Sequence, residues 1–352
     1  MAEYISFQPS DFFSPKLYTG NSSSAEIPVT GVGFQPDFVW AKNRDATYDH
    51  FLFDSVRGAT KYWRSNDTAI EGTNAQTLKS FDSDGYTMGT DSDINASTNG
   101  YASWNWKMGT TSGIGGSPST TPEGYSFNQT TGQSIIYYIG TSVAGGGPIA
   151  TLPHGLTKAP EFIIVKNLTA AARDTATYHV STGNTKRIYL NQTAAPNTTS
   201  SAWNDTTPGA TVFTVGGNEA VNELSKYFVA YCFTSIKGYS SFGKYIGNGN
   251  ADGTFTYTGF RPAWLMLRRI DGSGDNWMVY DSLREGYNGG NDYLKPNSNS
   301  AELASDQIDL LSNGFKIRSA DASINASSAD YIYCAFAEFP IVSSNDTPGV
   351  AR

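Results

Sequence analysis

Two acidic–basic pairs recur at the same spacing and are the first candidates for chemistry. Residues 54–57 read Asp-Ser-Val-Arg and residues 281–284 read Asp-Ser-Leu-Arg, so each places a carboxylate three residues before a guanidinium. Such a pair could clamp a ligand, or it could form an ion pair that fixes the corner between a strand and a turn. Because a substrate site rarely appears twice by duplication alone, the recurrence favours the structural role.

Histidine and cysteine commonly supply bases, nucleophiles and metal ligands, but their spacing here indicates none of these roles. His50, His154 and His179 are far apart in the chain, and neither they nor Cys232 and Cys334 show the spacing of a metal site or a disulfide framework. We interpret the histidines as surface residues or as partly satisfied ones.

Carboxylates could bind calcium or catalyse hydrolysis, and neither use is favoured. The two Asp-Ser-Asp triplets at 82–84 and 91–93 match no 12-residue calcium loop, and turn formation explains them better. A glycosidase needs two carboxylates about 5–9 Å apart, and no such pair can be nominated. We therefore expect a protein that is not an enzyme, with no catalytic residue, no metal and no cofactor, and the ligand-binding residues stay unknown.

The elements that would position these residues form a threefold internal repeat. A Tyr-x-Gly motif opens each copy, a Gly-apolar-x-Pro corner leads into an apolar strand, and an aromatic strand closes the copy. The motif begins at Tyr18, Tyr138 and Tyr245, the corner at Gly33, Gly155 and Gly259, and the closing strands span 101–106, 227–233 and 331–336. The run Ile-Asn-Ala-Ser at 94–97 returns unchanged at 324–327.

Short strands, many turn residues and alternating closing strands predict the fold class. We expect an all-β protein of three tandem antiparallel β-sandwich modules, jelly-roll-like in form. The expected parts are an N-terminal arm at 1–15, a first module at 16–108, a loose Gly/Ser/Thr linker at 109–133, a second module at 134–241, a third at 242–340 and a C-terminal tail at 341–352. The second and third modules have almost no slack between them and should pack rigidly.

Aligning the three copies assigns most aromatic residues to the core. Trp104 and Trp106 lie on the first closing strand, and Cys334 and Cys232 match their places, so we expect buried, unreactive thiols. Only Trp277 is left as a free, exposed tryptophan. Aromatic rings available for stacking on a sugar are therefore few, which weakens a lectin hypothesis without excluding binding by loops.

Composition narrows the possible partners. With 24 basic and 32 acidic residues the net charge is −8, which disfavours binding to a phosphate backbone. The N-terminus has neither the basic nor the apolar region of a signal peptide, and no apolar run approaches the ~18 residues of a membrane span. We expect synthesis in a host cytoplasm, no membrane insertion and no nucleic-acid partner.

Six stretches of the sequence carry recognisable motifs, at 7–13, 17–21, 31–40, 54–61, 259–263 and 312–316. These motifs resemble those of a family of uncharacterised β-repeat proteins, labelled structural or tail-fibre-like, from marine bacteriophages and cyanophages. The resemblance implies a virion component, such as a tail fibre or tail-associated appendage, that forms homo-oligomers, binds other virion proteins and contacts the host surface. Alternatives are a capsid decoration or head fibre protein, or a glycan-binding receptor-recognition module.

The expected arm, residues 1–15, is too apolar for a solvated tail. Its large apolar residues are Tyr4, Ile5, Phe7, Phe12 and Phe13. Such a segment could pair with a sheet edge or fill a groove on a neighbouring subunit, so we predict that these five residues contact a partner. The alternative, that the arm packs on the first module of its own chain, is nearly as well supported.

Overall fold

A computed structural model of the chain describes residues 5–21, 25–143, 147, 149–284, 288 and 290–340. In this part of the chain the fold is all-β, and its six sheets are antiparallel throughout. Three larger sheets each face a smaller one, and we call these the first, second and third sheet pairs in chain order. The expected tail at 341–352 lies outside the described residues.

The first sheet pair contains all strands up to β9. Its larger sheet has the order β1 (Phe13–Thr19), β9 (Gly100–Trp106), β3 (Phe38–Asn43), β4 (Phe51–Asp54), β5 (Lys61–Arg64) and β6 (Gly72–Thr73). Its smaller sheet has the order β2 (Ile27–Val29), β8 (Gly85–Met88) and β7 (Leu78–Asp82).

The second sheet pair has the same strand order with one strand added at an edge. Its larger sheet runs β10 (Gly124–Asn128), β11 (Gln133–Ile139), β18 (Tyr227–Phe233), β13 (Phe162–Asn167), β14 (Ala176–His179), β15 (Lys186–Tyr189) and β16 (Asn197–Thr198). Its smaller sheet pairs β12 (Ala150–Pro153) with β17 (Val212–Val215).

The third sheet pair is formed by the last strands of the chain. Its larger sheet runs β19 (Ser240–Ile246), β25 (Asp330–Pro340), β21 (Phe260–Arg269) and β22 (Met278–Asp281), and its smaller sheet runs β20 (Phe255–Tyr257), β24 (Gly314–Ile317) and β23 (Ile308–Leu311). Five short helices complete the elements: η1 (Pro9–Asp11), α1 (Ser92–Asn95), α2 (Ser200–Trp203), α3 (Glu219–Asn222) and α4 (Ala322–Asn325).

The Tyr-x-Gly motif that opens each repeat contacts a short helix of the same sheet pair. Tyr18 donates from its hydroxyl to Ile94 O in α1 at 3.0 Å. Gly20 is required beside it, because a Cβ there would lie 1.9 Å from Ala96 O. The other two sheet pairs repeat both contacts: Tyr138 with Val221 O and Gly140 with Glu223 O, Tyr245 with Ile324 O and Gly247 with Ala326 O.

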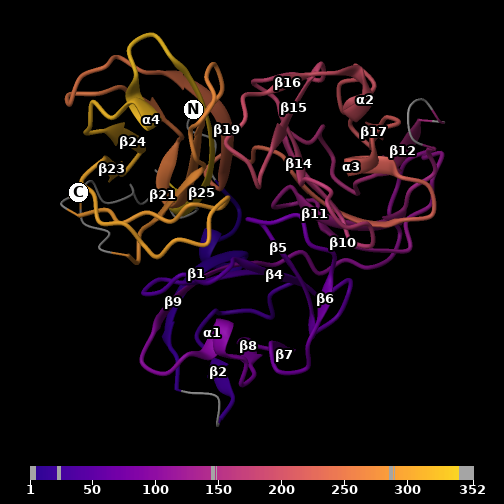
Figure 1. Ribbon diagram of the computed structural model, residues 1–352, viewed down its shortest axis with the longest axis horizontal. Coiled ribbons are helices and arrows are strands. Elements are labelled where there is room, and N and C mark those ends of the chain that lie inside the picture. Colours follow the sequence, from indigo (N-terminus) through magenta and orange to yellow (C-terminus); the bar gives the residue numbers. More distant parts are fainter. Residues whose placement is uncertain are drawn as a thin grey trace.

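Each larger sheet is buried on both faces. One face packs on its own smaller sheet, and the opposite faces of all three larger sheets meet in a central apolar core. In β9, Ser103 faces the smaller sheet and accepts from Tyr86 Oη at 2.6 Å, whereas Trp104 and Trp106 enter the central core. Figure 1 shows the three sheet pairs arranged around this centre. The expectation of self-contained units is therefore wrong, because the second apolar face is covered by the neighbouring sheets.

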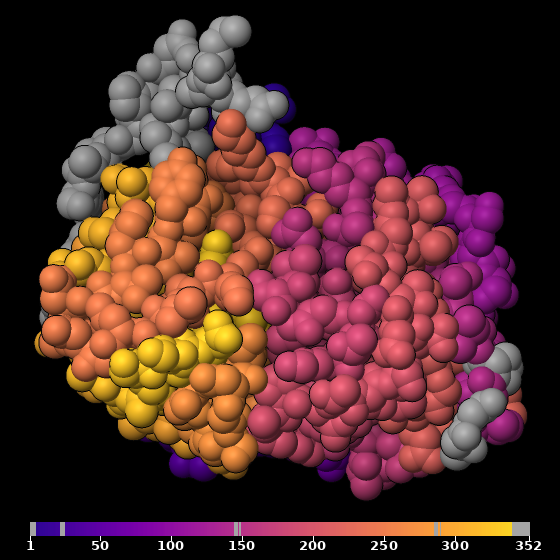
Figure 2. All heavy atoms as spheres, turned by 90° about the horizontal axis from the view of Figure 1, so that it is seen from above, coloured from indigo at the N-terminus to yellow at the C-terminus, as the bar shows by residue number. Residues whose placement is uncertain are grey.

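The segments between the sheet pairs are ordered by hydrogen bonds. Residues 109–133, which composition predicts to be a loose linker, contain β10, and it pairs with β11 along its whole length. Between the second and third pairs only residues 234–239 separate β18 from β19. The atoms of the second and third sheet pairs lie in contact over a broad face in Figure 2.

Candidate functional site

Asp54 and Arg57 form a buried ion pair at the end of β4. Arg57 Nε lies 2.6 Å from Asp54 Oδ2, and both side chains are 0 % exposed. The remaining guanidinium nitrogens donate to Glu71 Oε2 at 2.9 Å and Leu52 O at 3.3 Å. Because each guanidinium nitrogen has a partner within the chain and the side chain is fully buried, this pair fixes a corner and has no surface at which to clamp a ligand.

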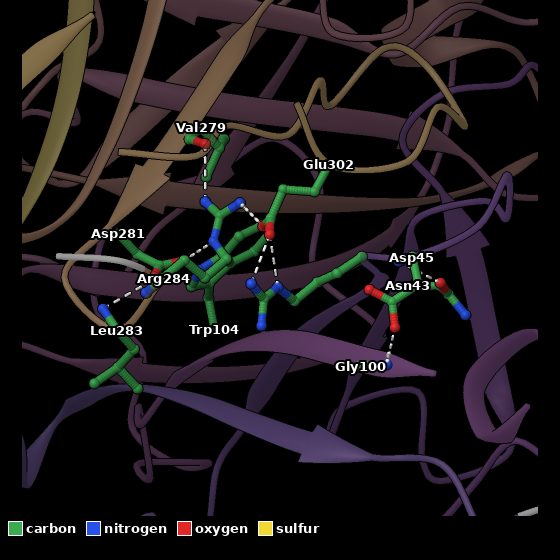
Figure 3. A network of polar contacts seen from close by, with 10 residues as sticks. Asn43, Asp45, Gly100, Trp104, Val279, Asp281, Leu283, Arg284 and Glu302 are labelled. Carbon is green, nitrogen blue, oxygen red and sulfur yellow. Dashed lines mark hydrogen bonds and ion pairs between the residues drawn. The ribbon is translucent and has the colours of Figure 1, made fainter. Parts of the chain in front are cut away.

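Asp281 and Arg284 repeat this arrangement at the end of β22 (Figure 3). Arg284 Nε lies 2.6 Å from Asp281 Oδ2, Nη1 lies 2.7 Å from Glu302 Oε2, and Nη2 donates to Val279 O at 2.9 Å. Glu302 also pairs with Arg44 of the first sheet pair at 2.6 Å. The second ion pair thus belongs to a network that joins the third sheet pair to the first.

The carboxylates keep both buried guanidinium groups charged. Burial alone would lower the pKa of Arg57, but the charges of Asp54 and Glu71 raise it above its ordinary value. Burial likewise opposes the charge of Arg284, and Asp281 and Glu302 raise its pKa in the same way. An ion pair this buried is costly to break from one side, since the partner then stays as an uncompensated charge.

The residue that ends β4, β14 and β22 contacts the next sheet pair in every case. Asp54 accepts from Tyr231 Oη of the second pair at 2.6 Å, and Asp281 accepts from Trp104 Nε1 of the first pair at 2.9 Å. At the same place in the second pair, His179 lies 3.1 Å from Tyr333 O of the third. We call these contacts the first joint (Asp54), the second joint (His179) and the third joint (Asp281). The first joint links the first sheet pair to the second, the second joint links the second to the third, and the third joint links the third to the first. The three sheet pairs therefore form a closed ring.

The three histidines are buried, and the expectation of surface positions is wrong. In each ring Nδ1 accepts a hydrogen bond, from Trp40 Nε1 for His50, Leu156 N for His154 and Ser181 N for His179. Each Nε2 lies beside a backbone carbonyl and must donate to it. All three are therefore neutral, with the proton on Nε2.

Burial explains the acidity of these imidazoles. Desolvation lowers the pKa of His154 and of His179 to about 4, and it lowers the pKa of His50 well below its ordinary value. Protonation would also place a second donor at Nδ1, opposite an N–H that already donates there. These residues serve the fold as neutral hydrogen-bonding groups at neutral pH.

A buried cation lies at the same place near the end of β3, β13 and β21. Lys42, Lys166 and Arg268 are at most 1 % exposed. Arg268 of the third sheet pair donates to three carbonyls of the second, those of Tyr189, Gln192 and Ala194. Burial lowers the pKa of Lys42 and of Lys166 to about 8 and that of Arg268 to about 10. Arg268 thus holds a loop of the second sheet pair against the central core, whereas Lys42 and Lys166 donate within their own sheet pairs, to Asn43 O and Arg173 O.

The two cysteines are buried thiols, but one was aligned wrongly. Cys334 pairs with Met266 just as Trp104 pairs with Trp40, and it lies in the central core as expected. Cys232 pairs with Ile163 and faces the smaller sheet, at the place that Asn105 has in β9. The sequence alignment takes Tyr227 as the counterpart of Tyr101, whereas in the strand register Phe228 has that place. Burial raises the pKa of both thiols, which keeps them protonated.

Trp277 is not the free tryptophan that the alignment predicts. Its side chain is 0 % exposed, and its Nε1 donates to Tyr189 O of the second sheet pair at 2.9 Å. Arg268 lies 5.2 Å from its ring centroid. Trp277→Ala should therefore destabilise the protein by about 3–5 kcal/mol, as Trp104→Ala should, because each leaves a cavity in the same core.

The apolar residues predicted to contact a partner lie on the central core of their own chain. Ile5 and Phe13 are buried in it, and Phe7 and Phe12 pack against its edge with their rings 5.1 Å apart. Tyr4 lies outside the described residues. A partner role for these residues stays a prediction, and Ile5 and Phe13 have almost no surface to offer in this conformation.

Sequence reasoning found the Asp–Arg pairs and missed the groups that complete them. Glu71 and Glu302 follow their arginines by 14 and 18 residues, so no fixed spacing marks them. The sequence assigns Trp104 to a core and Tyr231 to a closing strand, and the polar atoms of neither residue indicate an acidic partner. A signal for burial does exist, because each aspartate is the last residue of a four-residue strand and follows three apolar residues.

Two surface hollows of the described residues are also candidate sites. One of about 630 Å³ lies between the second and third sheet pairs and is lined by amides, hydroxyls and backbone from Asn191, Gln192, Thr193, Ala194, Ser273, Gly274, Asn276, Asn297 and Ser298. Another of about 500 Å³ lies at the side of the third sheet pair, between β19 and β20. Among the described residues no three His, Cys, Asp or Glu side chains lie together as a metal site. No described helix is long and apolar enough to cross a membrane.

Comparison with known proteins places the chain in a family by sequence. No curated protein and no solved structure matches it. One family model matches residues 8–340, which include all three sheet pairs and all three joints. The chain therefore belongs to the family described as Domain of unknown function (DUF7483).

Proposed function

We propose that the chain consists of three copies of one β-sandwich module closed into a ring, and that it is a non-enzymatic structural protein of a bacteriophage particle. The observation that carries the proposal is the closed ring of joints around one central core. Each larger sheet is buried on both faces, and at two of the three joints the aspartate also forms a buried ion pair with an arginine of its own corner. Such a body is rigid, as a load-transmitting particle component must be.

The place in the particle comes from the family resemblance of the sequence motifs. We propose a tail fibre or tail-associated appendage that assembles with further copies of itself and with other virion proteins. A head fibre or capsid decoration protein is the alternative within the same class. The three modules give the surface three similar faces, which suits repeated contacts in a symmetric particle.

Purified particles provide the test. Mass spectrometry should find the protein in particles after density-gradient purification, and cryo-electron microscopy should place its three-lobed body at the tail or the head. A particle preparation that infects normally and lacks the protein would contradict the proposal. An appendage on the head would select the alternative.

A second function, recognition of a host-surface glycan, is favoured by the hollow between the second and third sheet pairs. Its amide and hydroxyl lining suits the hydroxyl groups of a sugar. A glycan array with the purified protein tests it, with Gln192→Ala and Thr193→Ala as variants in the lining. Binding that both variants leave unchanged would place any glycan elsewhere.

A further inference from the structure

The second sheet pair shows how the side of such a pair can be closed by an extended segment. Ser119 and Thr151 exchange two hydrogen bonds, from Ser119 N to Thr151 Oγ1 at 2.7 Å and from Thr151 N to Ser119 Oγ at 2.9 Å. Thr120 N donates to Thr151 O at 3.2 Å, and Glu123 N donates to Tyr137 O at 2.8 Å. Residues 119–123 therefore bridge the smaller sheet, at β12, and the larger sheet, at β11, and they lead directly into β10, which pairs with β11.

The third sheet pair leaves the corresponding side open. By strand register, Phe255 in β20 has the place of Thr151, and Lys244 in β19 has the place of Tyr137. Between these two strands lies the groove of about 500 Å³. Phe255, Tyr257 and Ile246 border it and are 43 %, 61 % and 55 % exposed. Large side chains so exposed at a groove between two strand edges mark an interaction surface.

The two sides of the groove are joined by one hydrogen bond, from Thr254 Oγ1 to Ile246 O at 2.7 Å, and one buried polar atom inside it is unsatisfied. Thr256 has the place of Leu152, and its Oγ1 is buried with no hydrogen-bond partner in the described part of the chain. Phe242 N donates to Ser235 Oγ, away from β25, so alternation directs the backbone groups of Lys244 outward in the same way. The edge of β19 can therefore accept an extended segment where β11 accepts residue 123.

The first sheet pair gives the contrast. Pro28 lies at the place of Phe255 in its smaller sheet, and proline cannot donate a backbone hydrogen bond. Its edge is thus unsuited to the contact that Thr151 makes. The open, hydrogen-bonding edge is a specific property of the third sheet pair.

We propose that the groove between β19 and β20 binds an extended, proline-containing acidic peptide segment of a partner protein, in the way that residues 119–123 close the second sheet pair. The sequence of that internal segment, Ser-Thr-Thr-Pro-Glu, sets the chemistry. Proline matches the exposed ring of Tyr257. An acidic residue at the place of Glu123 faces the Lys244 ammonium, whose side chain is 54 % exposed and whose ion pair with Asp330, at 3.6 Å, is long and exposed enough to leave it able to bind a second carboxylate. Main-chain hydrogen bonds supply affinity, and these side chains supply specificity. The inference does not depend on where the protein is located.

The probe is a synthetic peptide with the sequence of residues 119–128, titrated into the full-length protein by isothermal calorimetry. Saturable binding at one site is expected. Tyr257→Ala should weaken it at least about tenfold, which corresponds to the loss of one aromatic contact of about 1.4 kcal/mol. Ile70→Ala, which removes a 48 % exposed side chain on another sheet pair, is the matched control and should bind normally.

A charge reversal keeps the test independent of folding defects. Lys244→Glu should weaken binding of the wild-type peptide, and a peptide carrying Glu123→Lys should restore it. The proposal is overturned if no saturable binding occurs at millimolar peptide, or if Tyr257→Ala and Lys244→Glu both bind like the wild type. It is also overturned if a chain ending at Pro340 binds far more tightly than the full chain, because the occupant would then be the chain's own tail.

Discussion

The second and third joints occupy the same place in their sheets and are built from opposite chemistry. At the third joint Asp281 is ionised, paired with Arg284 and bonded to Trp104 of the neighbouring sheet pair. At the second joint His179 is neutral and bonded to a backbone carbonyl. Thr182 stands where the arginine would be, and its hydroxyl only donates to His179 O.

This difference separates what the fold requires from what the sequence can vary. In each sheet pair the fold requires a polar group at the end of β4, β14 or β22, and this group must reach the closing strand of the next sheet pair. A buried carboxylate needs a cation to balance its charge, which Arg57 and Arg284 supply at the first and third joints. A neutral imidazole needs no counter-ion, but it is sensitive to acid. The two joints should therefore respond differently to mutation and to pH.

Removing the arginine of the third joint should have the largest effect. Arg284→Met leaves Asp281 and Glu302 buried without their shared cation, and we expect the free energy of unfolding to fall by about 3–5 kcal/mol. Urea denaturation at pH 7 measures it. The matched change at the second joint, Thr182→Val, removes only a neutral hydroxyl and should cost about 1 kcal/mol. Equal losses would mean that the two joints are held by the same kind of interaction.

Acid should weaken the second joint next. The folded pKa of His179 is about 4, below the ordinary value near 6.5, so the unfolded chain binds the proton more readily. Stability is complete above about pH 6.5 and falls as the pH drops towards 4, by about 3 kcal/mol from this residue. Between pH 7 and pH 4 the His179→Gln variant should therefore lose about 3 kcal/mol less stability than the wild type. Urea denaturation at each pH measures the difference.

A second buried histidine provides the control for this pH effect. His154 has the same lowered pKa but bonds within its own sheet pair, to Gly209 O. His154→Gln should reduce the pH dependence of stability by a similar amount. Only His179→Gln should also suppress acid-induced hydrogen exchange in β25, across the joint. If β25 exchanges identically in both variants, His179 does not govern the joint.

The comparison also shows which features the sequence can predict. Alternation in residues 101–106 gave the strand and its two faces, and the repeated motifs gave the matching strands of the three sheet pairs. Alternation cannot say what covers a face, so Trp104 was placed in a core whose position between three sheets was not foreseen. Trp277 was placed at the surface because its counterpart His50 was also taken for a surface residue, and both are buried.

The completing residues of the joints could not be predicted for a different reason. Asp54 and Arg57 lie three residues apart at one corner, so their spacing can be recognised in the sequence. Glu71 arrives from a loop, and Tyr231 arrives from another sheet pair, 177 residues away from Asp54. Contacts of this kind depend on how the sheets pack, and one sequence carries no local signal for them.

A single hydroxyl tests how much the first joint depends on its charge. Tyr231 Oη donates to Asp54 and accepts from Trp63 Nε1 at 3.0 Å. Tyr231→Phe keeps the ring and removes a bond to a charged acceptor, so the loss should be about 1.5–3 kcal/mol. Tyr138→Phe, in the same sheet, removes a bond to the neutral Val221 O and should cost about 1 kcal/mol. A larger loss for Tyr138→Phe would contradict a charge-assisted first joint.

The smallest effect is expected where an ion pair resembles the joints but faces solvent. Arg173 pairs with Glu219 at 2.9 Å and Glu223 at 3.0 Å, and its side chain is 29 % exposed. Water screens these charges, and ordering two long side chains opposes the attraction, so Arg173→Gln should lower the free energy of unfolding by about 1 kcal/mol or less. The difference from the wild type should vanish in 1 M salt, where the screening length is about 3 Å, while the loss from Arg284→Met should persist because salt does not reach that site. A loss of several kcal/mol from Arg173→Gln, unchanged by salt, would show that the number of carboxylates around an arginine, rather than its burial, sets the strength of these pairs.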